Sequence, residues 1–332
     1  MIHVNTTLRR VLQIAKWGCL VLVALGTAGG IYQISGEASD RRAYPPPGRL
    51  HHIEGFAMHL HCTGQGTPTV ILEAGNGGIT STWGWIQPQL AVHTRVCSYD
   101  RAGLGWSDER PGPRDAETVV RQLGSLLDVA GEPGPYVHVG HSMGGLYGRM
   151  FAAQLLAEVV GLVLVDASHP DQFNRFPEAI ARRTAMHTKA MRLAPSAARM
   201  GLVRATNIFG RMAEGLPSED YARAVAMSAS VRSVRTATAE FDAWDTNAAQ
   251  LATAPSLKDL PIAIITASEA PGAPEGLIDA HHANQRDLAR LSTQARHEII
   301  PGANHLSLLT DQRHAQATSR LILDLLDSVR GM

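Results

Sequence analysis

Residues 135–147 have the sequence Pro-Tyr-Val-His-Val-Gly-His-Ser-Met-Gly-Gly-Leu-Tyr, an apolar run that leads through Gly140-His141-Ser142-Met143-Gly144 into a helical pattern. This order of strand, tight turn and helix is typical of a Gly-x-Ser-x-Gly nucleophile turn. The glycines allow the turn to close without collision, and a strained serine backbone holds the hydroxyl clear of the sheet. We therefore predict that Ser142 is a nucleophile at the positive end of a helix. The alternative is an ordinary serine in a glycine-rich turn.

The composition is that of a large globular chain. It has 332 residues, of which 45% are apolar, and its 30 basic and 30 acidic residues balance. This length suits one large α/β domain with an insertion, or two small domains. No basic block is present, which argues against nucleic acid as a partner. Three cysteines, at positions 19, 62 and 97, are too few for a dense disulfide scaffold.

The first 36 residues resemble a membrane-targeting segment. Three basic residues, Arg9, Arg10 and Lys16, precede the uncharged residues 17–34. A retained signal anchor and a cleaved signal peptide both fit, and Ala28-Gly29-Gly30 would be the cleavage site. We favour the anchor, because apolar residues continue beyond that site.

The charges set the orientation that we expect for such an anchor. Because the positive charge comes before the span, the N-terminus would stay in the cytoplasm and the rest of the chain would be exported. An amphipathic helix docked on the domain is the remaining interpretation of these residues. Residues 37–48 are polar and end in three prolines and a glycine, which predicts a stiff linker before a domain that begins near Arg49.

From residue 49 onward, short apolar runs alternate with amphipathic segments. The expected strands are residues 50–54 and 56–62, which form a hairpin, then 69–73, 95–99, 136–139, 159–166, 261–267 and 297–300. The expected helices are residues 83–91, 115–129, 278–291 and 312–329, and a helix after Ser142 that ends at about residue 156. This alternation indicates an α/β fold with a mostly parallel, doubly wound sheet that is covered by helices on both faces.

The alternation stops between residues 167 and 255. This stretch is rich in Ala, Arg and Met at helical spacing, and we expect it to be a helical cap. The core would then consist of residues 49–166 and 256–332. The apolar character of the cap suggests an adaptable lid over small or medium apolar substrates.

A nucleophilic serine needs a base, and the base needs an orienting carboxylate. His305 follows the last expected strand, at the sheet edge where the serine turn also opens, and is the candidate base. Asp166 and Glu269 each follow a strand between Ser142 and His305, so both keep the order Ser, acid, His. Each of these carboxylates could instead pair with an arginine or cap a helix.

Two backbone N–H groups are expected to hold the developing oxyanion. One belongs to Met143, directly after the nucleophile. The other is that of Asn76, in the turn Gly75-Asn76-Gly77-Gly78, where bare backbone can approach a ligand closely. A plain glycine-rich turn is the alternative for this segment.

Together these segments resemble the α/β-hydrolase-fold serine hydrolases with a helical cap, the group that also contains esterases and haloalkane dehalogenases. The resemblance covers about residues 50–330 and rests on five motifs: residues 72–78, 98–107, 140–145, 162–166 and 302–305. It implies about eight strands and the hydrolysis of a carboxylic ester by a Ser-His-acid triad, without a cofactor.

Two positions refine this resemblance. Dehalogenases and epoxide hydrolases of this fold carry an Asp at the position of Ser142, which argues against both activities. The commoner acid position of the family follows the strand 261–267, where this chain has only Glu269, so we prefer Asp166 as the acid. A non-catalytic sensing protein on the same scaffold, and an acyltransferase or peptidase with the same residues, are the alternative functions.

Three further expectations concern cysteine, histidine and tryptophan. The resemblance implies that the strands with Cys62 and Cys97 are neighbours, so that the two thiols form a disulfide in an exported domain or are small buried groups. His59 and His61 share a strand face, but we expect no metal site there. Three tryptophans, at positions 83, 85 and 106, line the pocket or pack in the core.

Overall fold

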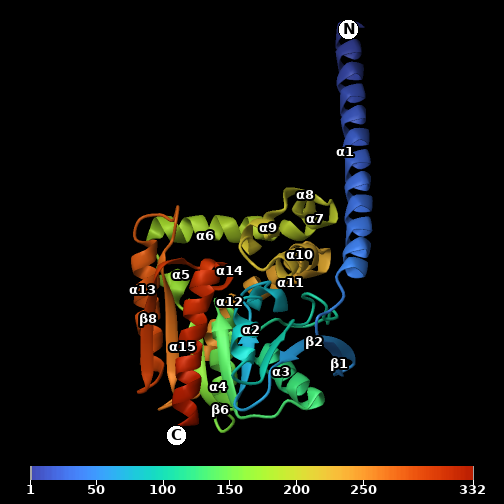
Figure 1. The fold of residues 1–332 in the computed structure, drawn as a ribbon. Coiled ribbons are helices and arrows are strands. Elements are labelled where there is room, and N and C mark those ends of the chain that lie inside the picture. The colour runs from blue at the N-terminus through green and yellow to red at the C-terminus, as the bar shows by residue number, and fades with distance from the viewer. Residues whose placement is uncertain (1, 332) are drawn as a thin grey trace.

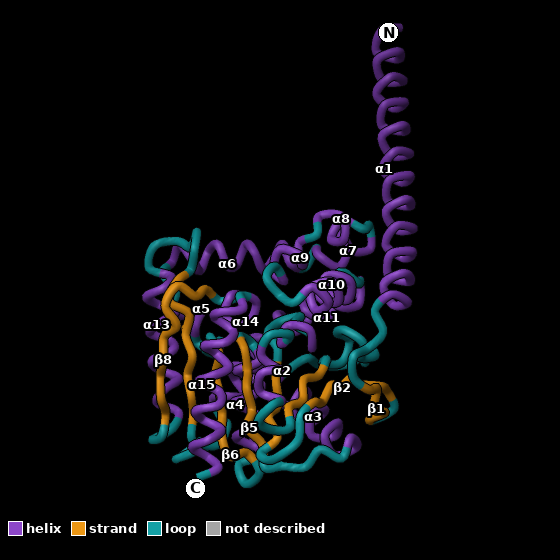
Figure 2. Tube along the Cα trace, viewed as in Figure 1, coloured by secondary structure: helices purple, strands orange, loops and turns teal. Residues whose placement is uncertain are grey.

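The computed structural model describes residues 2–331. An eight-stranded sheet with the order β1-β2-β4-β3-β5-β6-β7-β8 forms its centre (Figure 2). The strands are β1 (Arg49–Ile53), β2 (Phe56–Thr63), β3 (Thr69–Glu73), β4 (Val96–Tyr99), β5 (Tyr136–His141), β6 (Val159–Val165), β7 (Ile262–Glu269) and β8 (Ala295–Asn304). The β1–β2 and β2–β4 pairs are antiparallel and all other pairs are parallel. The expected mostly parallel sheet is confirmed.

Helices cover both faces of this sheet. The core helices are η1 (Thr80–Trp83), α2 (Ile86–Ala91), α3 (Ala116–Ala130), α4 (Gly144–Gln154), α13 (Leu277–Leu288), η2 (Ala289–Leu291), α14 (Ser307–Thr310) and α15 (Gln312–Arg330). In β6, Leu162 and Leu164 pack on the face that carries α3 and α4. Val163 and Val165 pack on the face that carries α2 and α15. Strands with two apolar faces explain why their sequences are continuously hydrophobic.

The disulfide that the resemblance implied is present. Cys62 of β2 and Cys97 of β4 are directly opposite each other in an antiparallel pair, and their sulfur atoms are bonded. Only the strand order brings these residues together, because 35 positions separate them in the chain. Disulfides persist in oxidising compartments, so this bond is consistent with a domain that is exported.

The segment between β6 and β7 is a cap of helices. They are α5 (Gln172–Arg175), α6 (Glu178–Met191), α7 (Ala194–Arg199), α8 (Leu202–Thr206), α9 (Ile208–Ala213), α10 (Ser218–Ser228), α11 (Val231–Asp242) and α12 (Trp244–Ala252). Helices α6 to α9 lie above the core in the view of Figure 1. The expected helical insertion therefore lies on one side of the core.

The N-terminal segment differs from the expectation. Helix α1 (Ile2–Ala43) continues through residues 37–43, so most of the expected linker is helical. The last part of α1 also belongs to the fold, because Gln33 is buried and its Nε2 donates to the carbonyl oxygen of Ala229 at 2.8 Å. Alanine, arginine and glutamate favour a helix here, and the prolines begin only at Pro45.

Candidate active site

The turn around Ser142 has the strained geometry that its sequence predicts. Strand β5 ends at His141, α4 begins at Gly144, and Ser142 between them has φ = 55°. A Cβ atom on Gly140 would lie 2.4 Å from the carbonyl oxygen of Gly144. Glycine is therefore required at position 140, and the positive φ of Ser142 is the strained backbone that the sequence predicts for a nucleophile turn.

Ser142, His305 and Asp166 lie in one chain of hydrogen-bonding groups. The distance from His305 Nε2 to Ser142 Oγ is 3.1 Å, and that from His305 Nδ1 to Asp166 Oδ2 is 2.6 Å. The three residues directly follow β5, β8 and β6 respectively. They lie close together because the carboxyl ends of parallel strands meet at one edge of the sheet. The His305 side chain is 45% exposed, so a ligand can reach it.

Asp166 is held by more than one partner. Its Oδ1 accepts hydrogen bonds from the backbone N–H of Ala267 at 2.9 Å and from His281 Nε2 at 2.8 Å. Burial by itself raises the pKa of Asp166, but the hydrogen bonds from His281 and His305 hold that pKa well below its ordinary value. The carboxylate is therefore ionised and can orient the His305 imidazole. His281 lies on α13, and no sequence rule connected it with this site.

Glu269, the alternative acid, lies at the last residue of β7. Its side chain is exposed and borders the same pocket. Within residues 2–331 it makes no hydrogen bond to His305. The structure thus brings Asp166, and not Glu269, to the imidazole.

His141 supports the backbone of His305. Burial, with a smaller effect of the neighbouring His305, lowers the pKa of His141 to about 3. The neutral ring donates its Nε2–H to the carbonyl oxygen of His305 at 3.0 Å. This contact positions the loop that carries the candidate base.

One expected oxyanion donor, Met143, directly follows Ser142 in the chain, and the loop that carries the other, Asn76, passes close to Ser142. A Cβ atom on Gly75 would be 3.0 Å from Ser142 Cβ, so the loop after β3 passes directly over the serine. Within residues 2–331, the backbone N–H groups of Asn76 and Met143 donate to no other protein group. The Asn76 side chain is turned to the cap, where its Nδ2 donates to the carbonyl oxygen of Ala237 at 2.8 Å.

A buried ionic cluster fastens this loop to the cap. Glu240 of α11 accepts from the backbone N–H of Gly77 at 2.9 Å through Oε2 and from Arg101 Nε at 2.6 Å through Oε1. Arg101 donates in turn to the carbonyl oxygen of Gly75 at 2.7 Å and to Glu73 at 2.6 Å. The sequence gives no sign of this role of Glu240, because nothing near it in the chain distinguishes it from a surface glutamate.

The fold and this geometry agree with a known family. A model of the alpha/beta hydrolase family matches residues 60–319, which is more than half of the chain and includes Ser142, Asp166 and His305. The chain belongs to the alpha/beta hydrolase family. The expected fold and family are confirmed.

Individual proteins that resemble this alpha/beta hydrolase are more distant. An uncharacterized protein of Schizosaccharomyces pombe is 28% identical over 305 residues, an alignment that covers 81% of this chain and 54% of that protein. An uncharacterized vacuolar membrane protein of Saccharomyces cerevisiae is 33% identical over 143 residues, which cover 37% of this chain and 22% of that protein. The chain therefore spans about half of the first relative and less of the second.

A solved structure with the same fold is that of an enol-lactonase from Burkholderia xenovorans LB400. The two structures superpose with a TM-score of 0.60 at 20% sequence identity, over 84% of this chain and 100% of the enol-lactonase. At this identity the likeness shows the fold alone.

The pocket at Ser142 lies between the core and the cap of this hydrolase. It has a volume of about 830 Å³, and its walls include Ser142 and His305 from the core. The cap contributes four apolar residues and four polar ones, namely Ala167, Phe176, Ile180 and Met212, and Ser168, Gln172, Arg183 and Thr184. The expected apolar lid is therefore only partly apolar where it faces the pocket.

Of the two alternatives for the three tryptophans, packing within the protein agrees with the structure, since none of them is among the residues that line this pocket. Trp83 is buried in the hydrophobic core, and Trp106 donates its Nε1–H to the carbonyl oxygen of Tyr44 at 2.9 Å. Trp85 donates in the same way to Gly215 at 2.8 Å. The three side chains bind backbone carbonyl groups or fill the core, as buried tryptophans commonly do.

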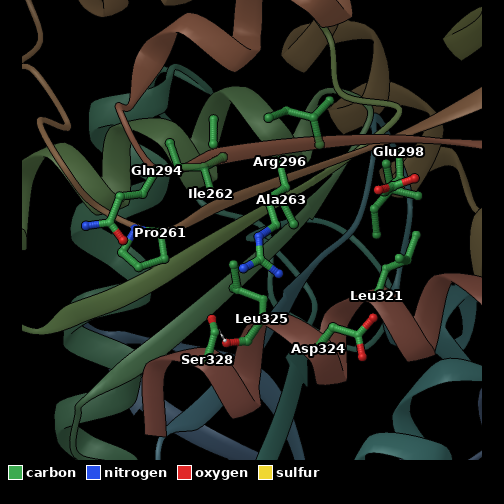
Figure 3. A pocket seen from close by; sticks show the side chains of 13 residues that line it. Pro261, Ile262, Ala263, Gln294, Arg296, Glu298, Leu321, Asp324, Leu325 and Ser328 are labelled. Carbon is green, nitrogen blue, oxygen red and sulfur yellow. Dashed lines mark hydrogen bonds between the residues drawn. The ribbon is translucent and has the colours of Figure 1, made fainter. Parts of the chain in front are cut away.

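A second cavity of this hydrolase, of about 360 Å³, lies between β7, β8 and α15 (Figure 3). Its walls include Arg296, Glu298 and Asp324. It is formed by the first residues of β7 and β8, whereas Ser142, Asp166 and His305 follow the carboxyl ends of their strands. This cavity is therefore at the opposite end of the sheet from the candidate active site.

His59, which shares a strand face with His61, is hydrogen-bonded to protein groups through its ring. His59 is buried, its Nδ1 lies 2.9 Å from Asp100 Oδ2, and its Nε2 accepts from the backbone N–H of Gly48 at 3.1 Å. Both ring nitrogens are thus engaged by protein groups. Cys62 and Cys97 lie close to Glu132, but their sulfur atoms are bonded to each other and are not thiolate ligands.

Proposed function

We propose that this alpha/beta hydrolase cleaves a carboxylic ester, with Ser142 as the nucleophile, His305 as the general base and Asp166 as the residue that orients it. The observation that carries the proposal is the continuous contact from Ser142 Oγ through His305 to Asp166. The enol-lactonase with the same fold acts, by its name, on a lactone, which is a cyclic ester.

The reaction follows from the positions of these groups. His305 Nε2 takes the proton of Ser142 as Oγ attacks the ester carbonyl carbon, and the N–H groups of Asn76 and Met143 stabilise the oxyanion. The C–O bond to the alcohol breaks, and the alcohol leaves with the proton from His305. Water then attacks the acyl-enzyme in the same way, which releases the acid and restores Ser142.

The test is the substitution Ser142→Ala, assayed with short p-nitrophenyl esters and with a fluorophosphonate probe. We expect the variant to lose both hydrolysis and labelling, whereas Ser256→Ala, an exposed serine outside the pocket, keeps both. Unchanged turnover in Ser142→Ala would refute the proposal. An unmodified protein that binds esters without reacting with the probe would instead be a sensing protein.

We further infer that α1 anchors the hydrolase in a membrane, with the N-terminus in the cytoplasm and the catalytic domain exported. Helix α1 is long and apolar enough to cross a membrane, and one relative is named as a vacuolar membrane protein. The basic residues before the span and the disulfide in the core support this orientation. Carbonate extraction and protease protection of the full chain test the anchor and its orientation respectively.

A further inference from the structure

The uncharged part of α1 overlaps with the part that contacts the cap. Residues 17–36 carry no charge, and 20 residues of helix span about 30 Å, the thickness of a hydrocarbon layer. Within this stretch, a Cβ atom on Gly29 would lie 2.2 Å from the carbonyl oxygen of Met200 in the cap. Gly29 is seven residues before Gly36, or about 10 Å along the helix. A bilayer around residues 17–36 therefore reaches the α7–α8 turn.

This contact between α1 and the cap is specific. Gly201, with φ = 73°, packs against Tyr32 and the backbone of Gly29. Further along α1, Asp40 forms an ion pair with Arg204 at 2.7 Å. Glycine at these positions allows the two backbones to approach closely. The contacts therefore fix the position of the cap along the axis of α1.

The cap segment next to α1 exposes apolar side chains. They lie within residues 193–212, where Leu193 is 70% and Leu202 51% exposed, and they include Met200, Ile208 and Met212. Figure 1 shows that α7, α8 and α9 are on the side of the molecule from which the N-terminal part of α1 projects. Exposed apolar groups that gather in one segment mark an interaction surface.

This segment and the part of α6 that precedes it are together strongly basic. Residues 182–211 contain seven basic side chains and no acidic one. Four of the seven, Arg183, Lys189, Arg199 and Arg211, form no ion pair within the part of the chain that the structure describes. Apolar groups surrounded by Lys and Arg are typical of surfaces that bind anionic lipid.

The active-site pocket is continuous with this surface. Met212 is 47% exposed and also lines the pocket, as do Arg183 and Ile180 of α6. An apolar chain that leaves the bilayer at Met212 therefore has an apolar path toward Ser142.

We propose that residues 193–212 of the cap lie on an anionic bilayer beside α1, and that the pocket takes from this bilayer an ester with a long apolar chain. This inference deepens the proposed ester hydrolysis and rests on it for the identity of the substrate. The position of the cap on the bilayer rests on the contacts of α1 and on the composition of the cap.

The first experiment measures the depth of the cap. The full chain carrying Cys19→Ser and Leu202→Cys is labelled with an environment-sensitive fluorophore and reconstituted in vesicles of equal parts phosphatidylcholine and phosphatidylglycerol. We expect a blue-shifted emission that nitroxide-labelled lipids quench. The matched control is Val92→Cys, an 82% exposed apolar position on the core, which we expect aqueous iodide to quench instead. Equal quenching of both labels by iodide would overturn the inference.

The second experiment measures the substrate path. The test variant carries both Leu202→Glu and Ile208→Glu, because charged side chains in place of apolar ones oppose contact with lipid. Relative to the control Val92→Glu, we expect this double variant to hydrolyse a vesicle-embedded long-chain ester about tenfold more slowly. Hydrolysis of a short soluble ester monitors the fold and the reacting groups. Equal hydrolysis of the embedded ester by both variants would overturn the proposed path. If the unmodified chain hydrolyses neither ester, ester hydrolysis itself is refuted, while the fluorescence still decides the position of the cap.

Discussion

Asp166 Oδ2 lies 2.6 Å from His305 Nδ1, although 139 positions separate the two residues in the chain. The contact requires β6 and β8 to end at the same edge of the sheet. It favours Asp166 over Glu269 as the carboxylate that orients the imidazole, because Glu269 at the end of β7 makes no such contact within residues 2–331. Substitutions of Asp166 and of Glu269 should therefore have different effects on kcat.

We predict that Asp166→Asn lowers kcat for ester hydrolysis by about four orders of magnitude, because an amide stabilises neither the required tautomer of His305 nor its charged form. Glu269→Gln is the matched control and should change kcat by less than about threefold, since its side chain lies outside the hydrogen-bonded chain. Steady-state rates on a p-nitrophenyl ester check both variants. Similar losses in the two variants would contradict the assignment.

Glu240 is predicted to act on catalysis from the cap. Glu240→Gln weakens the hold on Gly77 and on Arg101 while leaving the Arg101–Glu73 pair intact. Because the loop also presents the Asn76 N–H, kcat should fall by up to about 100-fold with a smaller change in KM. The control is Glu219→Gln, an exposed glutamate of the cap. If KM rises while kcat is unchanged, Glu240 shapes substrate binding instead.

Acid should destabilise the protein through two buried histidines. Burial lowers the pKa of His138 and of His141 to about 3. Between about pH 6.5, the ordinary pKa of histidine, and pH 3, both side chains therefore bind a proton in the unfolded chain but not in the folded one. Stability is therefore lost as the pH falls from about 6.5 toward 3, by about 1.4 kcal/mol per histidine at about pH 5.5.

The variant His138→Leu tests this sign, because neither ring nitrogen of His138 has a partner within the described residues. Urea unfolding at about pH 7.5 and 5.5 should show a loss of stability that is smaller by about 1.4 kcal/mol in the variant. The exposed His52→Leu serves as the control. An identical pH dependence in His138→Leu and the unmodified chain would rule out this source of acid sensitivity.

The Cys62–Cys97 bond should contribute to stability. It joins residues 35 positions apart, and closing such a loop in the unfolded chain stabilises the folded state by about 3–4 kcal/mol. Cys97→Ala, or reduction of the unmodified chain, should lower the urea midpoint accordingly, whereas Cys19→Ala should not. A midpoint that does not respond to reductant would show that the bond is absent from the protein in solution.

Two glycines of α1 test its contact with the cap. Gly29→Leu places a side chain where Met200 lies 2.2 Å from the Cβ position, whereas Gly18 has no neighbour within 4 Å. We predict that Gly29→Leu separates α1 from the cap and lowers the Tm of the full chain in detergent by about 1–2 °C, since a loss of about 1 kcal/mol shifts Tm by about 2–4 °C in chains of about 150–250 residues and by less in a longer chain. Gly18→Leu should leave Tm unchanged. Equal Tm values for the two variants would argue against the packing.

Most elements of the core could be predicted from the sequence, because their signals are local. Strands such as β3 and β6 are continuous apolar runs, and α3 has its apolar residues on one side and Asp115 as an N-cap. The predicted end of the N-terminal helix was wrong. The prolines suggested a linker from residue 37, but the helix formers before Pro45 continue α1 through Ala43.

What the sequence by itself determined is the family, the glycine-bounded turn at Ser142 and the position of His305 after the last strand, because these depend on neighbours in the chain. The tertiary structure alone decided the partner of His305, the hold of Glu240 on the loop after β3 and the contact of α1 with the cap. Each of these joins residues more than 100 positions apart, and such contacts arise only from how the strands are ordered and how the cap folds back over them.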